Sequence, residues 1–134
     1  MPDDSALPDE IKDAIDRLID SLPGLEFLML AYREPDRGWT ASELARPLGT
    51  SEKTVEALLA QMRKRGLLTG DPAQPHFDAR TPLYAQVEII ARAYGARRIE
   101  LINYVASGAL RRVRALSDAF RLKPRKTDEG GDKS

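Results

Sequence analysis

Few side chains of this sequence have the chemistry that catalysis requires, and none of them occurs in a catalytic spacing. His76 is the single histidine, and the chain contains no cysteine. A lone imidazole beside Phe77 has no second ligand or acid–base partner, so we interpret it as a surface residue. No glycine-rich phosphate loop with a following lysine is present, and no serine accompanies a histidine–carboxylate pair. We therefore expect a protein that is not an enzyme and that holds no cofactor and no metal.

The charged side chains divide the sequence into an acidic start and a basic end. Residues 1–20 hold seven acidic and two basic side chains, whereas residues 92–126 hold ten basic and two acidic ones. The whole chain is nevertheless balanced, with 21 basic and 21 acidic residues. Such a division indicates either that the two ends pair with each other or that the basic end faces a polyanion.

Length and composition fit one compact domain with one or two accessory helices. The chain has 134 residues, of which 42% are hydrophobic, enough for a core. No apolar stretch approaches the roughly 20 residues that cross a bilayer, and the acidic N-terminus is unlike a leader sequence. We therefore expect a soluble, cytoplasmic protein. The polar residues 123–134 are expected to be a disordered tail.

Apolar spacing predicts two helices in the first quarter of the chain. The first, within an acidic N-terminal segment 1–22, begins at Pro8 and has an apolar stripe at Ile11, Ile15, Leu18 and Leu22. Leu22-Pro23-Gly24 is expected to end this helix. Residues 25–34 are apolar on nearly every side, which indicates a helix within a small core, and residues 35–38 should end it.

The middle of the chain contains a capping box and a glycine turn. Thr40 and Glu43 predict the start of a short helix at Ala41, and Gly49 allows a tight exit from it. Thr50 or Ser51 then caps another helix, which Gly66 ends and whose buried stripe is Val55, Leu58, Leu59 and Met62. We interpret Trp39, just before the capping box, as a core or strand anchor.

The residues that follow predict a hairpin and then a long helical segment. Residues 67–69 and 76–78 have the pattern of two short strands around a turn at 70–75. Residues 81–122 would form a basic C-terminal helix with an apolar stripe at Leu83, Val87, Ile90, Tyr94, Leu101, Val105, Val113, Leu116 and Phe120. Gly95 or Gly108 could bend or divide this helix, so its continuity stays open.

The order of these elements is that of a known fold, and the residues resemble its members. WTASELARPLGTSEKTVEALLAQMRKRGLL, residues 39–68, resembles the core of bacterial winged helix-turn-helix regulators, and the resemblance covers about residues 25–80. Residues 84–105 and 117–126 are similar to small bacterial winged-helix proteins without an assigned activity. The resemblance implies a mainly α fold, in which residues 23–80 form a three-helix core with a β-hairpin wing.

The resemblance also implies a recognition helix at about residues 51–65, whose N-terminal half enters the major groove of DNA. Its exposed residues would be Ser51, Glu52, Lys53, Glu56, Ala57, Ala60 and Arg63. The expected DNA-binding residues are Thr40, Ser51, Lys53, Thr54, Arg63, Lys64 and Arg80, because hydroxyls and cations suit bases and phosphates. Glu52 and Glu56 fit poorly near phosphates, because like charges repel. The charge of Glu52 also suits the N-terminus of its helix. The basic cluster 63–65 either grips phosphate or only complements the end of its helix.

Two functions follow from this interpretation. The first is a DNA-binding transcriptional regulator, and the alternative is a winged-helix adaptor that binds a protein without sequence-specific DNA reading. A continuous positive surface over residues 51–63 and the wing would favour DNA, whereas a neutral or apolar surface would favour a protein.

The C-terminal helix is also open to several interpretations. Its apolar stripe could pair with a second chain and give a homodimer that presents two recognition helices. Alternatively, the helix could pack on residues 9–22 of the same or a partner chain, with complementary charges. Attachment to a membrane surface is a weaker alternative, since Arg97 and Arg98 interrupt the apolar face.

Overall fold

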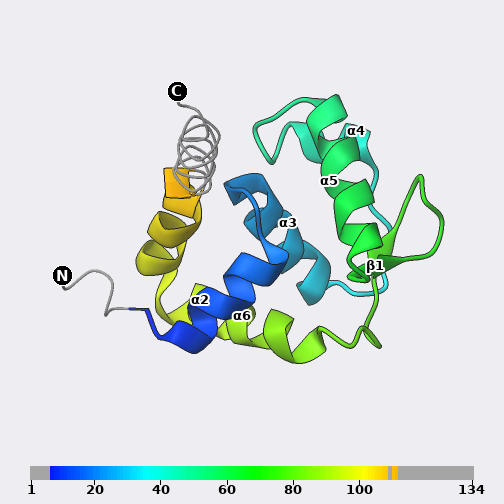
Figure 1. Cartoon of the computed structure of the whole chain (residues 1–134). Coiled ribbons are helices and arrows are strands. Elements are labelled where there is room, and N and C mark those ends of the chain that lie inside the picture. Colours follow the sequence, from blue (N-terminus) through cyan, green and yellow to red (C-terminus); the bar gives the residue numbers. More distant parts are fainter. Residues whose placement is uncertain (1–6, 109, 112–134) are drawn as a thin grey trace, which may run out of the picture.

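A computed structural model, which describes residues 7–108, 110 and 111, shows a mainly helical chain with one short hairpin (Figure 1). The elements in order are α2 (Asp9–Leu18), α3 (Leu22–Arg33), α4 (Ala41–Ala45), α5 (Glu52–Lys64), β1 (Leu68–Thr69), β2 (His76–Phe77) and α6 (Tyr84–Ala96). Residues 98–108 are helical again. The winged helix-turn-helix fold predicted from the sequence is therefore confirmed. The tail 123–134 and the end of the predicted C-terminal helix, 112–122, lie outside the described residues.

The boundary between the first two helices differs from the predicted one. The Oγ atom of Ser21 accepts a hydrogen bond from the N–H of Gly24 at 3.2 Å, so Ser21 caps α3. Pro23 lies in the first turn of α3, where its missing N–H removes no helical hydrogen bond. α2 already ends at Leu18, and Ile19 is extended. Residues 22–24 thus begin the second helix, and the expectation that they end the first was wrong.

α4 and α5 form the helix-turn-helix. At the start of α4 the N–H of Thr40 donates to Glu43 Oε2 at 2.8 Å, and Thr40 Oγ1 accepts from the N–H of Glu43 at 3.2 Å. The predicted capping box is therefore present. Gly49 has φ of +67°, a conformation that favours glycine, and it turns the chain from α4 into α5. Residues 41–65 are consequently two helices packed on each other.

A single core lies beneath these elements. Val55, Leu59 and Met62 of α5 are buried in it, as predicted, whereas Leu58 is only partly buried. Trp39 is 4% exposed and meets the Phe27 ring edge-on at 5.9 Å, which confirms it as a core anchor. The hairpin is antiparallel and pairs Leu68 with Phe77 and Thr69 with His76. Among the described residues, no helix is long and apolar enough to cross a membrane.

The segment after the hairpin does not form one straight helix. α6 ends at Ala96, and Arg97 leaves the helical conformation with φ of −136° and ψ of 50°. The Nε atom of Arg98 donates to the carbonyl oxygen of Tyr94 at 3.3 Å and so satisfies part of the C-terminus of α6. The break falls just after Gly95, where the predicted apolar stripe is interrupted. The sequence left open whether the C-terminal helix is continuous. The structure shows two helices, with the break at Arg97.

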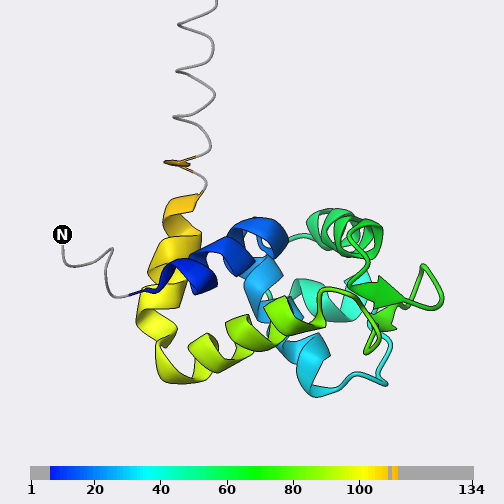
Figure 2. The same cartoon turned by 60° about the horizontal axis from the view of Figure 1, so that its bottom comes forward.

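The acidic and basic ends of the chain meet within one molecule. α2 packs on α6, and the hydroxyl of Tyr104 lies 3.0 Å from both carboxylate oxygens of Asp16. Arg111 lies 3.6 Å from the same carboxylate and stacks on the Tyr104 ring at 3.8 Å. Burial, with the neighbouring Asp16 next, raises the pKa of Tyr104. The helical residues 98–108 lie at the opposite side of the molecule from the hairpin (Figures 1 and 2).

Candidate nucleic-acid interface

α5 presents one outer face that no other described element covers. Ser51 caps the helix through a hydrogen bond from the N–H of Thr54 to Ser51 Oγ, at 3.1 Å. Every residue that was expected to be exposed is exposed: Ser51, Glu52, Lys53, Glu56, Ala57, Ala60 and Arg63. The buried stripe on the opposite side holds the helix against the core. This confirms that α5 is an outward-facing helix on a fixed base.

Along that face, two lysines enclose two alanines. Lys53 and Lys64 are eleven residues apart, which is about three helical turns and places them on the same side of α5. Ala57 and Ala60 lie between them and are exposed. No ion pair within 4.0 Å joins either lysine to a described residue. This face therefore has small side chains in the middle and a lysine at each end.

Three hydroxyl groups that are expected to contact DNA already have hydrogen-bond partners within the chain. Thr40 Oγ1 serves the capping box of α4, and its residue is only partly exposed. Ser51 Oγ donates to Thr54 Oγ1 at 3.0 Å while it caps α5. These three side chains therefore have positions fixed by local structure, and their hydrogen bonds to bases stay a prediction.

The three basic side chains at the end of α5, residues 63–65, differ in their contacts. Arg63 Nη1 donates to the carbonyl oxygen of Gly70 at 2.7 Å, which attaches the hairpin to α5. Arg65 points elsewhere: it donates to the carbonyl oxygen of Leu18 at 2.8 Å and lies 2.9 Å from the Asp20 carboxylate. Only Lys64 is exposed without such a contact to the described residues. The sequence could not separate these roles, because all three residues share one helical turn.

The hairpin is held close to α5 and to the chain before α4. The N–H of Trp39 donates to the carbonyl oxygen of Pro75 at 3.0 Å. Arg80, just after the hairpin, is exposed and forms no ion pair with a described residue. His76 Nδ1 lies 3.1 Å from the carbonyl oxygen of Phe77, and the described residues contain no cluster of potential metal ligands. Arg80 is therefore an exposed cation that follows the hairpin.

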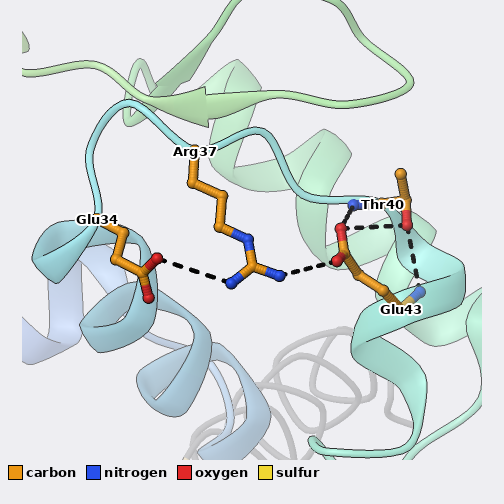
Figure 3. A network of polar contacts seen from close by, with 4 residues as sticks. All are labelled: Glu34, Arg37, Thr40 and Glu43. Atoms are coloured by element: carbon orange, nitrogen blue, oxygen red, sulfur yellow. Dashed lines mark hydrogen bonds and ion pairs between the residues drawn. The ribbon is translucent and has the colours of Figure 1, made fainter.

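An arginine that the sequence analysis overlooked organises the entrance to the helix-turn-helix. Figure 3 shows the Arg37 guanidinium between two carboxylates, 3.0 Å from Glu43 and 3.7 Å from Glu34. It also stacks on the Trp39 ring at 3.9 Å. The hydrogen bond from Thr40, with Arg37 contributing, lowers the pKa of Glu43. Arg46, exposed in the turn between α4 and α5, is a second cation that was overlooked.

The surface formed by α5 and the hairpin is close to neutral. Residues 51–80 hold five basic and four acidic side chains, and one of the basic ones, Arg65, is paired with Asp20. Glu52 and Glu56 are exposed near the start of α5. The continuous positive surface that would favour DNA most strongly is therefore absent from these residues, and the cations lie at separate points.

No protein-family model matches the chain, and no curated protein matches it. A solved structure of a MarR family protein from Mycobacterium tuberculosis, in complex with salicylic acid, superposes with a TM-score of 0.46 at 21% identity. The superposition covers 89% of this chain and 92% of that one. The order and packing of the helices and the hairpin, and not this similarity, show the winged helix-turn-helix fold.

Proposed function

We propose that the protein binds double-stranded DNA and regulates transcription, with α5 in the major groove and the hairpin beside it. The observation that supports this most is the outer face of α5, where exposed Ala57 and Ala60 lie between Lys53 and Lys64. Small side chains let the helix backbone approach base edges closely. The lysines, roughly 16 Å apart along the axis at 1.5 Å per residue, could reach phosphates on both sides of a groove about 12 Å wide.

Readout in this arrangement would come from the N-terminal half of α5. The hydroxyls of Ser51 and Thr54 can hydrogen-bond to base edges, and Glu52 or Glu56 can accept from the amino group of cytosine. Arg80 would contact the backbone beside the groove. A cytoplasmic location follows from this function.

The near-neutral surface predicts a modest dependence of binding on salt. If Lys53, Lys64 and Arg80 each neutralise one phosphate, the slope of log K against log salt is about −3. A surface with many more phosphate contacts would give a much steeper slope.

Replacing Lys53 and Lys64 together by alanine tests the proposal. Arg63 is left in place because its guanidinium holds the hairpin. Loss of two phosphate contacts should weaken binding to a short duplex about 10- to 100-fold at low salt and make the salt slope shallower by about 2. Fluorescence anisotropy across a salt series measures both quantities.

The matched control is Arg17→Ala with Arg92→Ala, which removes the same two positive charges from exposed positions on α2 and α6. Its affinity should stay within about twofold of the wild-type value at moderate salt, because charges outside the contact surface are largely screened. Equal losses in both variants would mean that α5 is not the contact surface.

The second candidate function is a protein-binding adaptor, and the observation that favours it is the neutral surface of residues 51–80. In this function, α5 would bind a protein partner without phosphate contacts. Purification of the full chain at low salt separates the two functions: nucleic acid that co-purifies supports DNA binding, and a polypeptide supports the adaptor. A wild-type protein that binds no duplex at low salt would contradict the proposal.

A DNA-binding regulator of this type would act as a homodimer, because two copies of α5 could then contact adjacent half-sites. The predicted route to this dimer is the C-terminal helix. The homodimer is part of this proposal.

A further inference from the structure

Gln61, in the third turn of α5, has an exposed side-chain amide. The amide forms no hydrogen bond within the part of the chain that the structure describes. Because an amide both donates and accepts, it can pair with a base edge that presents one acceptor and one donor. Gln61 is therefore a candidate for base reading that hydroxyls and charges do not provide.

Gln61 shares the outer face of α5 with two alanines. At 3.6 residues per turn, Ala57 lies almost opposite the buried stripe of α5, with Ala60 and Gln61 about 50° to either side. All three are exposed, and α5 lies at an outer edge of the molecule (Figures 1 and 2). Side chains lean toward the N-terminus of their helix, so the Gln61 amide extends toward the turn of Ala57. Two methyl groups and one amide thus form the centre of this face.

The basic side chains of α5 have other positions or contacts. Arg63 is the only basic residue between Lys53 and Lys64 in the sequence. Its guanidinium donates to the carbonyl oxygen of Gly70 at 2.7 Å, which holds it at the hairpin. The two lysines lie at the ends of the face, where the proposed function assigns them to phosphates. Glu56, which is also exposed on α5, adds acceptors and no donor.

Adenine–thymine pairs match the groups at the centre of the face. In the major groove adenine presents N7 as an acceptor and N6 as a donor, and a glutamine amide can bond to both. Thymine adds a C5-methyl group, against which an alanine methyl group can pack. Guanine instead presents two acceptors, N7 and O6, which suit an arginine or lysine side chain. Guanine–cytosine pairs therefore match the centre less well.

We propose that the centre of α5 reads adenine–thymine pairs in the major groove, with the Gln61 amide on adenine and the methyl groups of Ala57 and Ala60 against thymine. This inference rests on the proposed function, because it names the base pairs that the DNA-binding face selects. Glu52 and Glu56, nearer the start of α5, concern neighbouring pairs.

Four alternating duplexes of equal length test the base preference: adenine–thymine, adenine–uracil, guanine–cytosine and hypoxanthine–cytosine. Uracil is thymine without its C5-methyl group. Hypoxanthine is guanine without its 2-amino group, so its pair with cytosine keeps the major-groove edge of guanine–cytosine and has a minor groove like that of adenine–thymine. Fluorescence anisotropy with the full chain, at one low salt concentration, gives the four dissociation constants.

The full chain should bind the adenine–thymine duplex about 10-fold more tightly than the guanine–cytosine duplex. Loss of the thymine methyl groups should weaken binding about 3- to 10-fold, because apolar surface then stays in water. The hypoxanthine–cytosine duplex should bind as weakly as guanine–cytosine, since α5 reads the major groove. These comparisons use the unaltered chain and do not depend on the folding of a variant.

Gln61→Ala should remove most of the preference for adenine–thymine over guanine–cytosine. Its matched control is Asn103→Ala, which removes an exposed amide from the helical residues 98–108 and should keep the preference. Circular dichroism shows whether both variants are folded.

Ala57→Gly with Ala60→Gly should abolish the difference between thymine and uracil, because no side-chain methyl group is left to contact the base. Ala85→Gly with Ala96→Gly is the control, since it places two glycines at exposed positions of α6 and should leave that difference unchanged.

Equal affinity of the wild type for the four duplexes overturns this inference and leaves the proposed function standing. Tight binding of hypoxanthine–cytosine does the same, because it would place the reading in the minor groove. A base preference that folded Gln61→Ala and the folded glycine variant both retain also overturns it, since other residues would then be the readers. A wild type that binds none of the four duplexes contradicts the proposed function as well.

Discussion

Arg37 shows how a single side chain can join the elements that lead into the helix-turn-helix. Its guanidinium reaches the last residue before the loop, Glu34, and the first turn of α4 at Glu43. Its flat face covers the Trp39 ring, whose buried Nε1 has no hydrogen-bond partner among the described residues. The cation thus joins the end of α3 to the start of α4 (Figure 3) and also packs on the tryptophan anchor. α4 in turn supports α5.

Glu43→Ala should therefore destabilise the fold in a pH-dependent way. The pKa of Glu43 is lowered in the folded chain, so its carboxylate contributes stability above its ordinary pKa, and this contribution is lost as the pH falls through the lowered value. We expect the variant to lose about 1 kcal/mol at neutral pH and the difference from wild type to shrink under acid conditions. Urea unfolding at both pH values measures this.

Glu26→Ala is the control for this prediction. Glu26 is exposed on α3 and forms no ion pair with a described residue, so its loss should change stability little at either pH. A Glu43 effect that stays constant from neutral to acid pH would show that the carboxylate charge is unimportant.

The hairpin is an element that depends on its neighbours. Strands of two residues each are too short to be stable alone. Arg63 and Trp39 hold it through hydrogen bonds to Gly70 and Pro75. Gly38 lies so close to the turn that a Cβ atom there would be 2.8 Å from the carbonyl oxygen of Gln74. The wing is thus positioned from both sides.

Gly38→Ala should displace the hairpin, because a backbone oxygen cannot move away as easily as the end of a side chain. We expect a loss of about 1–3 kcal/mol in the free energy of unfolding and faster hydrogen exchange at the N–H of Trp39. Gly95→Ala is the matched control: a Cβ there meets nothing within 4 Å, and α6 should gain about 0.5–1 kcal/mol. Equal stability of the two variants would disprove the close approach.

At the scale of the whole molecule, the chain near its N-terminus connects the end of α5 with the helical residues after α6. Asp16 holds Tyr104 and Arg111 on the C-terminal side. Asp20, four residues later, pairs with Arg65 at the end of α5. Acidic side chains from the start of the sequence thus pair with basic side chains of the same molecule.

Tyr104→Phe should loosen this connection. Removing the hydroxyl deletes its hydrogen bonds to the Asp16 carboxylate and should cost about 1 kcal/mol of stability, measured by urea unfolding. Tyr94→Phe is the control, because no hydrogen bond of the Tyr94 hydroxyl to a described residue is present. If both variants lose the same stability, the bond to Asp16 does not hold the two ends together.

The sequence alone determined the elements whose causes are local. Thr40 with Glu43, Ser51 with Thr54 and the turn at Gly49 act over three or four residues, so their spacing predicted the start of α4, the start of α5 and the corner between them. The buried stripe of α5 follows from helical periodicity alone. The helix boundary near Pro23 also has a local cause. A proline, however, is equally compatible with the end of one helix and with the first turn of the next.

Only the tertiary structure decided which charges pair and which apolar face points outward. The partners of Arg65 and Tyr104 lie 45 and 88 residues away, at Asp20 and Asp16, and no local pattern connects such positions. Residues 98–108 have apolar side chains both in the core, at Leu101 and Val105, and outside it, at Ile99, so periodicity could not distinguish the buried face from the exposed one. That choice depends on where α2 and α6 pack, because a helix buries whichever apolar side the rest of the chain covers.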